Sequence, residues 1–162
     1  MSHFYPTAEY AEDQPLARTI LATHVASRGF QLGTALGLIS YTIESAFKRR
    51  SMTVPLLLRS AGAGSIIGAG ISTVGMVARM WGREDIEWND RSWRLRYNTG
   101  QLAMDNWSEP GAIMGALAVA LRGPLVAMSG GWRGVAGGAG IGSLVGVIGC
   151  ICFTEGFQKK TK

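Results

Sequence analysis

The sequence has few of the residues that metal sites and disulfides need. Only two of its 162 residues are cysteine, Cys150 and Cys152, and only two are histidine, His3 and His24. Neither pair has the spacing of zinc ligands, and cysteines two positions apart on a helix are poorly placed to bridge each other. The sequence also has no P-loop and no G-x-S-x-G elbow. We therefore expect no catalytic residue, no cofactor and no metal.

Charge is also scarce over long stretches of the chain. Charged residues make up 17 % of the sequence and gather between Arg79 and Glu109. The net charge of +5 would point to nucleic acid in a soluble protein, but here Lys and Arg flank apolar segments, as they do beside membrane spans. We expect membrane lipids, and no nucleic acid, as partners. The acidic Glu9, Glu12 and Asp13 argue against a secretory signal and a mitochondrial presequence.

Glycine is the residue present in excess, with 23 copies. Five of them stand four residues apart, which predicts a ridge about 24 Å long on one helix. Each glycine costs about 1 kcal/mol relative to alanine in a soluble helix, whereas small-xxx-small ridges let membrane helices approach closely. We expect this ridge to dock other subunits rather than line a pore. These five glycines, which we call the ladder, are Gly130, Gly134, Gly138, Gly142 and Gly146. Three shorter pairs have the same spacing, namely Gly33 and Gly37, Gly64 and Gly68, and Gly111 and Gly115.

The apolar runs predict an all-α membrane protein with four transmembrane helices. Runs of this length are enough to cross the hydrocarbon core. The alternative is a soluble helical domain with unusually apolar helices, in which glycine ridges would be hard to keep helical. The predicted spans are residues 29–47, 55–80, 111–128 and 132–153.

The remaining segments are polar. Residues 1–28 are predicted to form an arm and a short helix, and residues 154–162 a basic tail. Residues 81–110, rich in tryptophan, separate the hairpins 29–80 and 111–153 and are predicted to contain a short surface helix.

The charge of the short loops predicts the orientation of the spans. Lys48, Arg49 and Arg50 follow the first span, and Arg133 follows the third. Because short loops rich in Lys and Arg stay in the cytoplasm or matrix, we expect both termini and the polar middle segment on the opposite side.

Three charged residues fall inside the predicted spans, namely Glu44, Arg59 and Arg122. Intramembrane charges are candidates for a proton or ion path, but charges near span ends also snorkel to the interface. We expect Glu44 and Arg59 to fix the first hairpin. For Arg122 and Arg59 we favour contacts with lipid or a partner.

The tryptophans of the middle segment are further candidate contacts. Trp is enriched at membrane interfaces and at binding hot spots. We therefore expect Trp88, Trp93 and Trp107 to meet lipid headgroups or a partner subunit.

The four glycine-rich spans resemble those of the mitochondrial inner-membrane translocase family. The segments EWNDRSWRLRYNTGQLAMDNWSEPGAIMGA, residues 87–116, and FYPTAEYAED, residues 4–13, are similar to a small accessory subunit of fungal-type complex I, the mitochondrial NADH:ubiquinone oxidoreductase. The resemblance implies a multi-pass inner-membrane subunit without redox centres that supports assembly or stability of the membrane arm. The termini would then face the intermembrane space. A translocase-like or channel-forming protein is the alternative, although the spaced Arg and Asp that lead into a glycine pair in translocases are not cleanly present.

Overall fold

The computed structural model describes the backbone of residues 5–160 and the side chains of residues 5–153. This part of the chain is helical and contains no strand, which confirms the all-α prediction. The predicted basic tail is helical as far as Lys160, and its side chains and last two residues lie outside the described part. The elements in order are η1 (Ala11–Asp13), α1 (Ala17–Phe47), α2 (Val54–Met80), α3 (Asp85–Tyr97), α4 (Thr99–Ala120), α5 (Gly123–Met128) and α6 (Trp132–Lys160).

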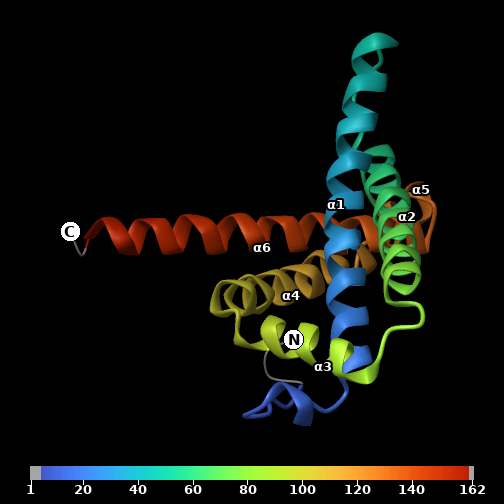
Figure 1. Ribbon diagram of the computed structural model, residues 1–162. Coiled ribbons are helices and arrows are strands. Elements are labelled where there is room, and N and C mark those ends of the chain that lie inside the picture. Colours follow the sequence, from blue (N-terminus) through green and yellow to red (C-terminus); the bar gives the residue numbers. More distant parts are fainter. Residues whose placement is uncertain (1–4, 161–162) are drawn as a thin grey trace.

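The helices form two pairs (Figure 1). Helix α1 packs along α2, and α4 packs along α6. The first pair crosses the second steeply, so that α2 also contacts α6 near the start of α6. Helix α3 and the N-terminal arm lie together at the end of the molecule where α1 begins.

Two helices begin earlier than the predicted spans. The short helix expected before residue 29 is continuous with the first span, and both belong to α1. Helix α4 begins at Thr99 and includes Pro110, although the predicted span began after that proline. The Asn98 side chain caps α4 by accepting a hydrogen bond from the Gln101 amide at 3.1 Å. The polar middle segment therefore supplies α3 and the first half of α4.

The predicted span 111–128 is wrong as a single helix. Helix α4 ends at Ala120, Arg122 lies in the break, and α5 restarts at Gly123. Pro124 explains the break, because proline has no N–H to donate to the carbonyl four residues earlier. Arg122 is thus exposed at a helix break instead of within a span.

The prediction of four spans also needs correction. Only two of the described helices, α2 and α6 as far as Phe153, are long and apolar enough to cross a membrane. Helix α1 contains Gln31, Thr34 and Glu44, which lower its mean hydropathy. In α4 the apolar part begins only after Pro110 and is about half the length that a span needs.

Side chains are distributed in the reverse of the usual manner. The largest fully buried side chains are Thr34, Ser65, Ser92 and Ser129. A few large apolar side chains, such as Ile20, Leu58 and Met80, are buried, but many more face outward, and small residues fill much of the space between the helices. The exposed ones on the four long helices include Leu32, Leu36, Ile39, Ile67, Ile71, Val74, Ile113, Met114, Val145 and Ile148.

The N-terminal arm is clamped on α3 by polar contacts. Arg96 is buried and donates to the Tyr5 carbonyl at 2.8 Å and to the Thr7 hydroxyl. The Trp93 indole donates to the Ala8 carbonyl at 3.2 Å. A second contact joins the Asn89 amide to the Glu12 carbonyl at 2.9 Å. These hydrogen bonds fix the arm without a large apolar interface.

Candidate functional site: helix crossings, a polar cluster and a basic pocket

The glycines of α1 and α2 bring the two backbones into direct contact. A Cβ atom added at Gly33 would fall closer than 3.0 Å to the carbonyl of Gly64, and one added at Gly68 would do so against the carbonyl of Gly29. Gly37 meets the backbone of Ser60 in the same way. Real Cβ atoms are not found at such distances, so only glycine permits this approach.

The long ladder on α6 is used in the same way against α4. Gly138 lies against Gly115, and Gly142 lies against Gly111, in each case with no room for a Cβ. Gly146 is equally close to the Trp107 carbonyl. The ridge expected to dock other subunits is therefore occupied within the chain by α4.

The ladder does not extend over all five glycines. Gly130 lies before α6, in the turn from α5, with φ +83°. Its neighbour Gly131 also has a positive φ, which glycine adopts without a steric penalty. Gly134 is inside α6 but faces the Ser129 side chain of the preceding turn. The prediction of one five-glycine ridge is thus wrong at Gly130, because the spacing does not show where the helix begins.

Glycines outside the predicted pairs join the two helix pairs. Gly62 of α2 lies against the Arg133 carbonyl, and Gly137 of α6 lies against the Leu58 carbonyl. Gly140 meets the Thr34 side chain of α1. The sequence analysis missed Gly137 and Gly140 because they belong to other faces of α6 than the ladder.

A polar cluster of Arg28, Gln31, Asp105 and Ser143 links α1, α4 and α6. Arg28 forms an ion pair with Asp105, and their side chains are only 26 % and 12 % exposed. Arg28 also donates to the Gln31 amide oxygen at 2.6 Å, and Gln31 donates to the Ser143 hydroxyl at 2.8 Å. Burial makes this pair costly to break, because the remaining charge would have no partner.

This cluster was not predicted from the sequence, because Arg28 and Asp105 lie outside the predicted spans in which intramembrane charges were expected. One local pattern does indicate a buried polar contact on α1. Gln31 and Thr34 are three residues apart and so share one face of the helix within a mostly apolar stretch. Both side chains are buried, as expected for polar groups that face other helices.

His24 lies one turn before Arg28 on α1. Burial lowers the pKa of His24 below its ordinary value, and the positive charge of Arg28 adds to this effect. The negative charge of Asp105 acts in the opposite direction. The neutral imidazole is therefore favoured beside the cluster.

A pocket of about 270 Å³ adjoins the cluster between α1, α2, α4 and α6. Gln31, Asp105 and Glu109 line it together with three serines. The rest of its lining is apolar and consists of Ala26, Phe30, Ala69 and Ala112. The pocket can hold water or a small ligand with both polar and apolar groups.

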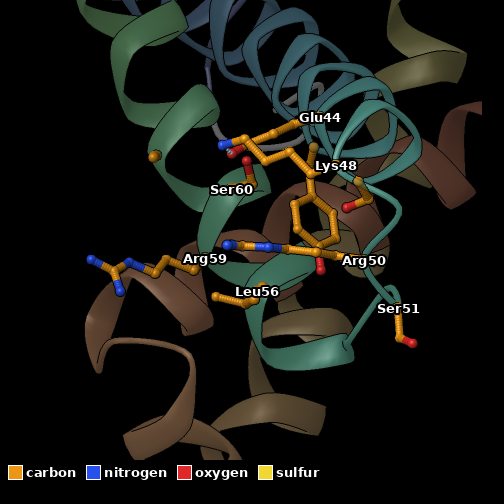
Figure 2. A pocket seen from close by; sticks show the side chains of 10 residues that line it. Glu44, Lys48, Arg50, Ser51, Leu56, Arg59 and Ser60 are labelled. Carbon is orange, nitrogen blue, oxygen red and sulfur yellow. Dashed lines mark hydrogen bonds and ion pairs between the residues drawn. The ribbon is translucent and has the colours of Figure 1, made fainter.

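A second pocket, of about 390 Å³, lies at the turn from α1 to α2. Figure 2 shows Lys48, Arg50 and Arg59 around it, with Glu44 beside Lys48. Glu44 and Arg59 both line this pocket, as the hairpin prediction required, but the ion pair of Glu44 is with Lys48. Arg59 instead lies along the turn that contains Gly130. A Cβ atom added to Gly130 would lie 3.6 Å from the Cδ atom of Arg59.

The three candidate tryptophans have different surroundings. Trp88 is half-buried beneath the Arg18 guanidinium, which lies 5.5 Å from the ring centroid. Trp93 is half-buried against the N-terminal arm. Trp107 is 43 % exposed and packs on Phe153, with 5.6 Å between ring centroids. Of the three, Trp107 offers the most surface to lipid or a partner.

Residues 5–153 contain no group of three or more His, Cys, Asp or Glu side chains that could hold a metal ion. Neither Cys150, which is buried, nor Cys152, which is exposed, forms a disulfide. The chemistry available at these sites is thus charge pairing, hydrogen bonding and close helix packing.

Comparison with curated proteins finds no match. The profile of a family described as a protein of unknown function (DUF1757) matches residues 1–151. The match includes the glycine-packed helices, the polar cluster and the basic pocket. Because it covers nearly the whole chain, this protein belongs to the DUF1757 family.

Proposed function

We propose that this chain is a non-catalytic accessory subunit of mitochondrial complex I that supports assembly or stability of the membrane arm. The observation that supports a membrane subunit most directly is the reversed distribution of side chains. The largest fully buried side chains are serine and threonine, while many leucine, isoleucine and valine side chains of the long helices face outward. Water would disfavour so much exposed apolar surface, whereas lipid or an apolar partner would cover it.

The low burial of the two apolar helices supports the same proposal. Within the chain, 22 % of the apolar window of α2 and 33 % of that of α6 are buried. The core helix of a soluble protein would be mostly covered by its neighbours. Most of the apolar surface of α2 and α6 is therefore available to lipid or another subunit.

We further propose that α1 and the apolar half of α4 enter the membrane beside the two candidate spans, α2 and α6. Each is held by glycine contacts along an apolar partner helix. Their outward side chains, such as Leu36 and Met114, are apolar, and the polar Gln31 and Thr34 face inward. Because the pairs cross steeply, at least one pair must be strongly tilted in the bilayer.

The positions of the basic turns are compatible with the expected orientation. Arg59, beside the turn from α1 to α2, lies close to Gly130 in the turn from α5 to α6. The basic loop that contains Lys48, Arg49 and Arg50 and the turn before Arg133 are thus on the same side of the molecule, as expected if both lie on one side of the membrane. The arm and α3 lie at the opposite end of α1.

The assignment to complex I rests on the resemblance of residues 87–116 and 4–13. These segments form most of α3 and of α4 and, from residue 5 onward, the clamped arm. Apart from the apolar residues after Pro110, they make a polar unit beside the membrane helices, where contacts with other subunits are expected. The test is to follow the tagged protein on a native gel of mitochondrial membranes solubilised in mild detergent. It should co-migrate with NADH dehydrogenase activity, and its deletion should deplete the assembled complex.

Migration of the protein only as a small free species would contradict the proposal. Release of the protein by alkaline carbonate would contradict membrane insertion itself. The two results are independent, so the assignment to complex I can fail while the membrane placement stands.

A channel-forming or translocase-like protein is the second candidate, and the pocket between the four helices favours it. Gln31, Asp105 and Glu109 line this pocket, and polar or charged side chains inside a membrane are the kind of feature an ion path needs. Purified protein in planar bilayers should then conduct ions, and Asp105→Asn should change the cation selectivity. Conductance no greater than in a lipid-only control would exclude this candidate.

A further inference from the structure

The pocket at the turn from α1 to α2 differs from the rest of the bundle in its charge. We propose that it binds the phosphate group of an anionic phospholipid. The inference rests on the membrane placement proposed above and is independent of complex I. It identifies a ligand and a binding site that the proposed function does not require.

Three cationic side chains surround the pocket, and two of them are available to an anion. Glu44 is the one carboxylate among its lining residues, and it pairs with Lys48. Neither Arg50 nor Arg59 forms an ion pair within residues 5–153, and both are exposed. Figure 2 shows Arg50 reaching across the pocket toward α2, the helix that carries Arg59. Guanidinium groups bind phosphate with two parallel hydrogen bonds. The Arg50 side chain lies across the pocket, and the exposed Arg59 side chain extends outward toward the Gly130 turn, so Arg59 turns inward when both bind one phosphate.

The conformation of the turn from α1 to α2 determines where Arg50 lies relative to α2. The Thr53 amide donates to the Tyr41 hydroxyl at 3.0 Å, which ties the end of the turn to α1. Arg49 has a φ of +46°, a left-handed conformation that reverses the chain directly before Arg50. The hydroxyls of Ser51 and Ser60 add donors for a phosphate oxygen. The pocket volume of about 390 Å³ is in the range of small-molecule sites.

The surroundings favour a phosphate that is attached to a lipid. The pocket lies where the apolar helix α2 begins, at the level that headgroups occupy if α2 spans the membrane. Leu56 lines the pocket, and Ile43, Phe47 and Val54 are exposed on the adjoining turns. Acyl chains can lie on these side chains while the phosphate contacts the arginines.

The test compares two lipids on the full-length protein. The chain is purified in neutral detergent and titrated with phosphatidylglycerol or with phosphatidylcholine of the same acyl chains. Bound lipid is then measured by native mass spectrometry. Wild-type protein should retain phosphatidylglycerol preferentially, and the double variant Arg50→Gln/Arg59→Gln should weaken this retention by about tenfold or more, because two charge-assisted contacts are lost. Phosphatidylcholine retention should not change.

A matched control has the same loss of charge elsewhere. Arg83→Gln/Arg94→Gln removes two exposed arginines of the polar middle segment and should leave phosphatidylglycerol retention unchanged. Thermal unfolding of both double variants should stay near that of wild type, since substitutions of exposed side chains have small effects. Lost retention in the pocket variant would then not come from misfolding.

The other outcomes overturn the proposal. Equal retention of the two lipids by wild-type protein, or an undiminished preference in Arg50→Gln/Arg59→Gln, would show that the pocket does not select an anionic headgroup. Displacement of phosphatidylglycerol by inorganic phosphate would assign the pocket to a soluble anion. Release of the chain by alkaline carbonate would contradict the membrane placement instead, so the two failures can be distinguished.

Discussion

Between the helices of each pair the contacts are backbone against backbone, whereas between the N-terminal arm and α3 they come from large polar side chains. In the pairs, glycines such as Gly33 and Gly138 leave no room for a Cβ. In the clamp, Trp93 and Arg96 reach back to carbonyls of the arm. Segments that are distant in sequence are thus joined in two ways. Glycines, which have no side chain, let two helix backbones touch, whereas large polar side chains bridge the arm and α3 with hydrogen bonds.

The two kinds of contact should respond differently to mutation. A glycine crossing cannot adjust, because a new side chain meets the backbone of the opposite helix. A hydrogen-bonded clamp can lose one bond and keep its others. Substitutions at the glycine crossings should therefore cost more stability than substitutions in the clamp.

Gly138→Leu should destabilise the protein most, by about 3 kcal/mol or more, because the new side chain collides with the Gly115 backbone. Thermal unfolding in detergent micelles measures the effect. The matched controls are Gly70→Ala and Gly75→Ala, since a Cβ at either position meets nothing within 4 Å. These should be neutral or stabilising by up to about 1 kcal/mol. Equal losses in all three variants would mean that close approach is not what the glycines provide.

Asp105→Asn should have the next largest effect, a loss of about 2–3 kcal/mol. It leaves the half-buried Arg28 without its charged partner, which destabilises proteins more than removal of an exposed pair. The control is Asp85→Asn, whose ion pair with Arg18 is exposed and should contribute less than about 1 kcal/mol. Urea or thermal unfolding of both variants measures the difference. Similar small losses would show that the polar cluster does not hold α1 to α4.

Trp93→Phe should remove the hydrogen bond to the Ala8 carbonyl, with a cost of about 1 kcal/mol. The helix pairs have no part in this contact, so the loss should be confined to the arm. Limited proteolysis should cut the arm faster than in wild type while the helices stay protected. Uniformly faster cleavage of the whole chain would contradict the separation of the two regions.

Acidification should have the smallest effect, through His24. Because the pKa of His24 is lower in the folded chain than its ordinary value of 6.5, the unfolded chain binds a proton at this residue more readily. The contribution of neutral His24 to the free energy of unfolding is therefore fully present above pH 6.5 and is lost as the pH falls below 6.5. After allowance for solvent screening the loss should be under about 1 kcal/mol. The unfolding midpoint of wild type should fall more between about pH 7.5 and pH 5.5 than that of His24→Gln, and identical falls would exclude this group as the cause.

Much of the helical architecture was predictable, because the apolar runs and glycine spacing are local signals. The glycine pairs Gly33/Gly37 and Gly64/Gly68 were expected to pack closely, and they lie against each other. Helix ends were less predictable. Pro110 is tolerated inside α4, where contacts with α6 hold the helix together, while Pro124 lies at a break. The two prolines look alike in sequence and differ only in what surrounds them.

The candidate sites were predicted in part. Glu44 and Arg59 were expected at the same hairpin, and both line its pocket. The pairing of Arg28 with Asp105 joins residues 77 positions apart, and no local pattern could indicate it. The same holds for Gly62 and Gly137, which join the two helix pairs.

The sequence by itself determined that the chain is helical, that its helices approach closely through small residues, and that its charge gathers in the turns and the middle segment. These properties depend on composition and on spacings of three or four residues. Only the tertiary structure decided which ridge meets which, so that α6 packs on α4 and is not left free for another subunit. The physical reason is that a glycine ridge fits any other small-residue ridge, and the steep crossing of the two pairs, together with the polar cluster, selects one partner.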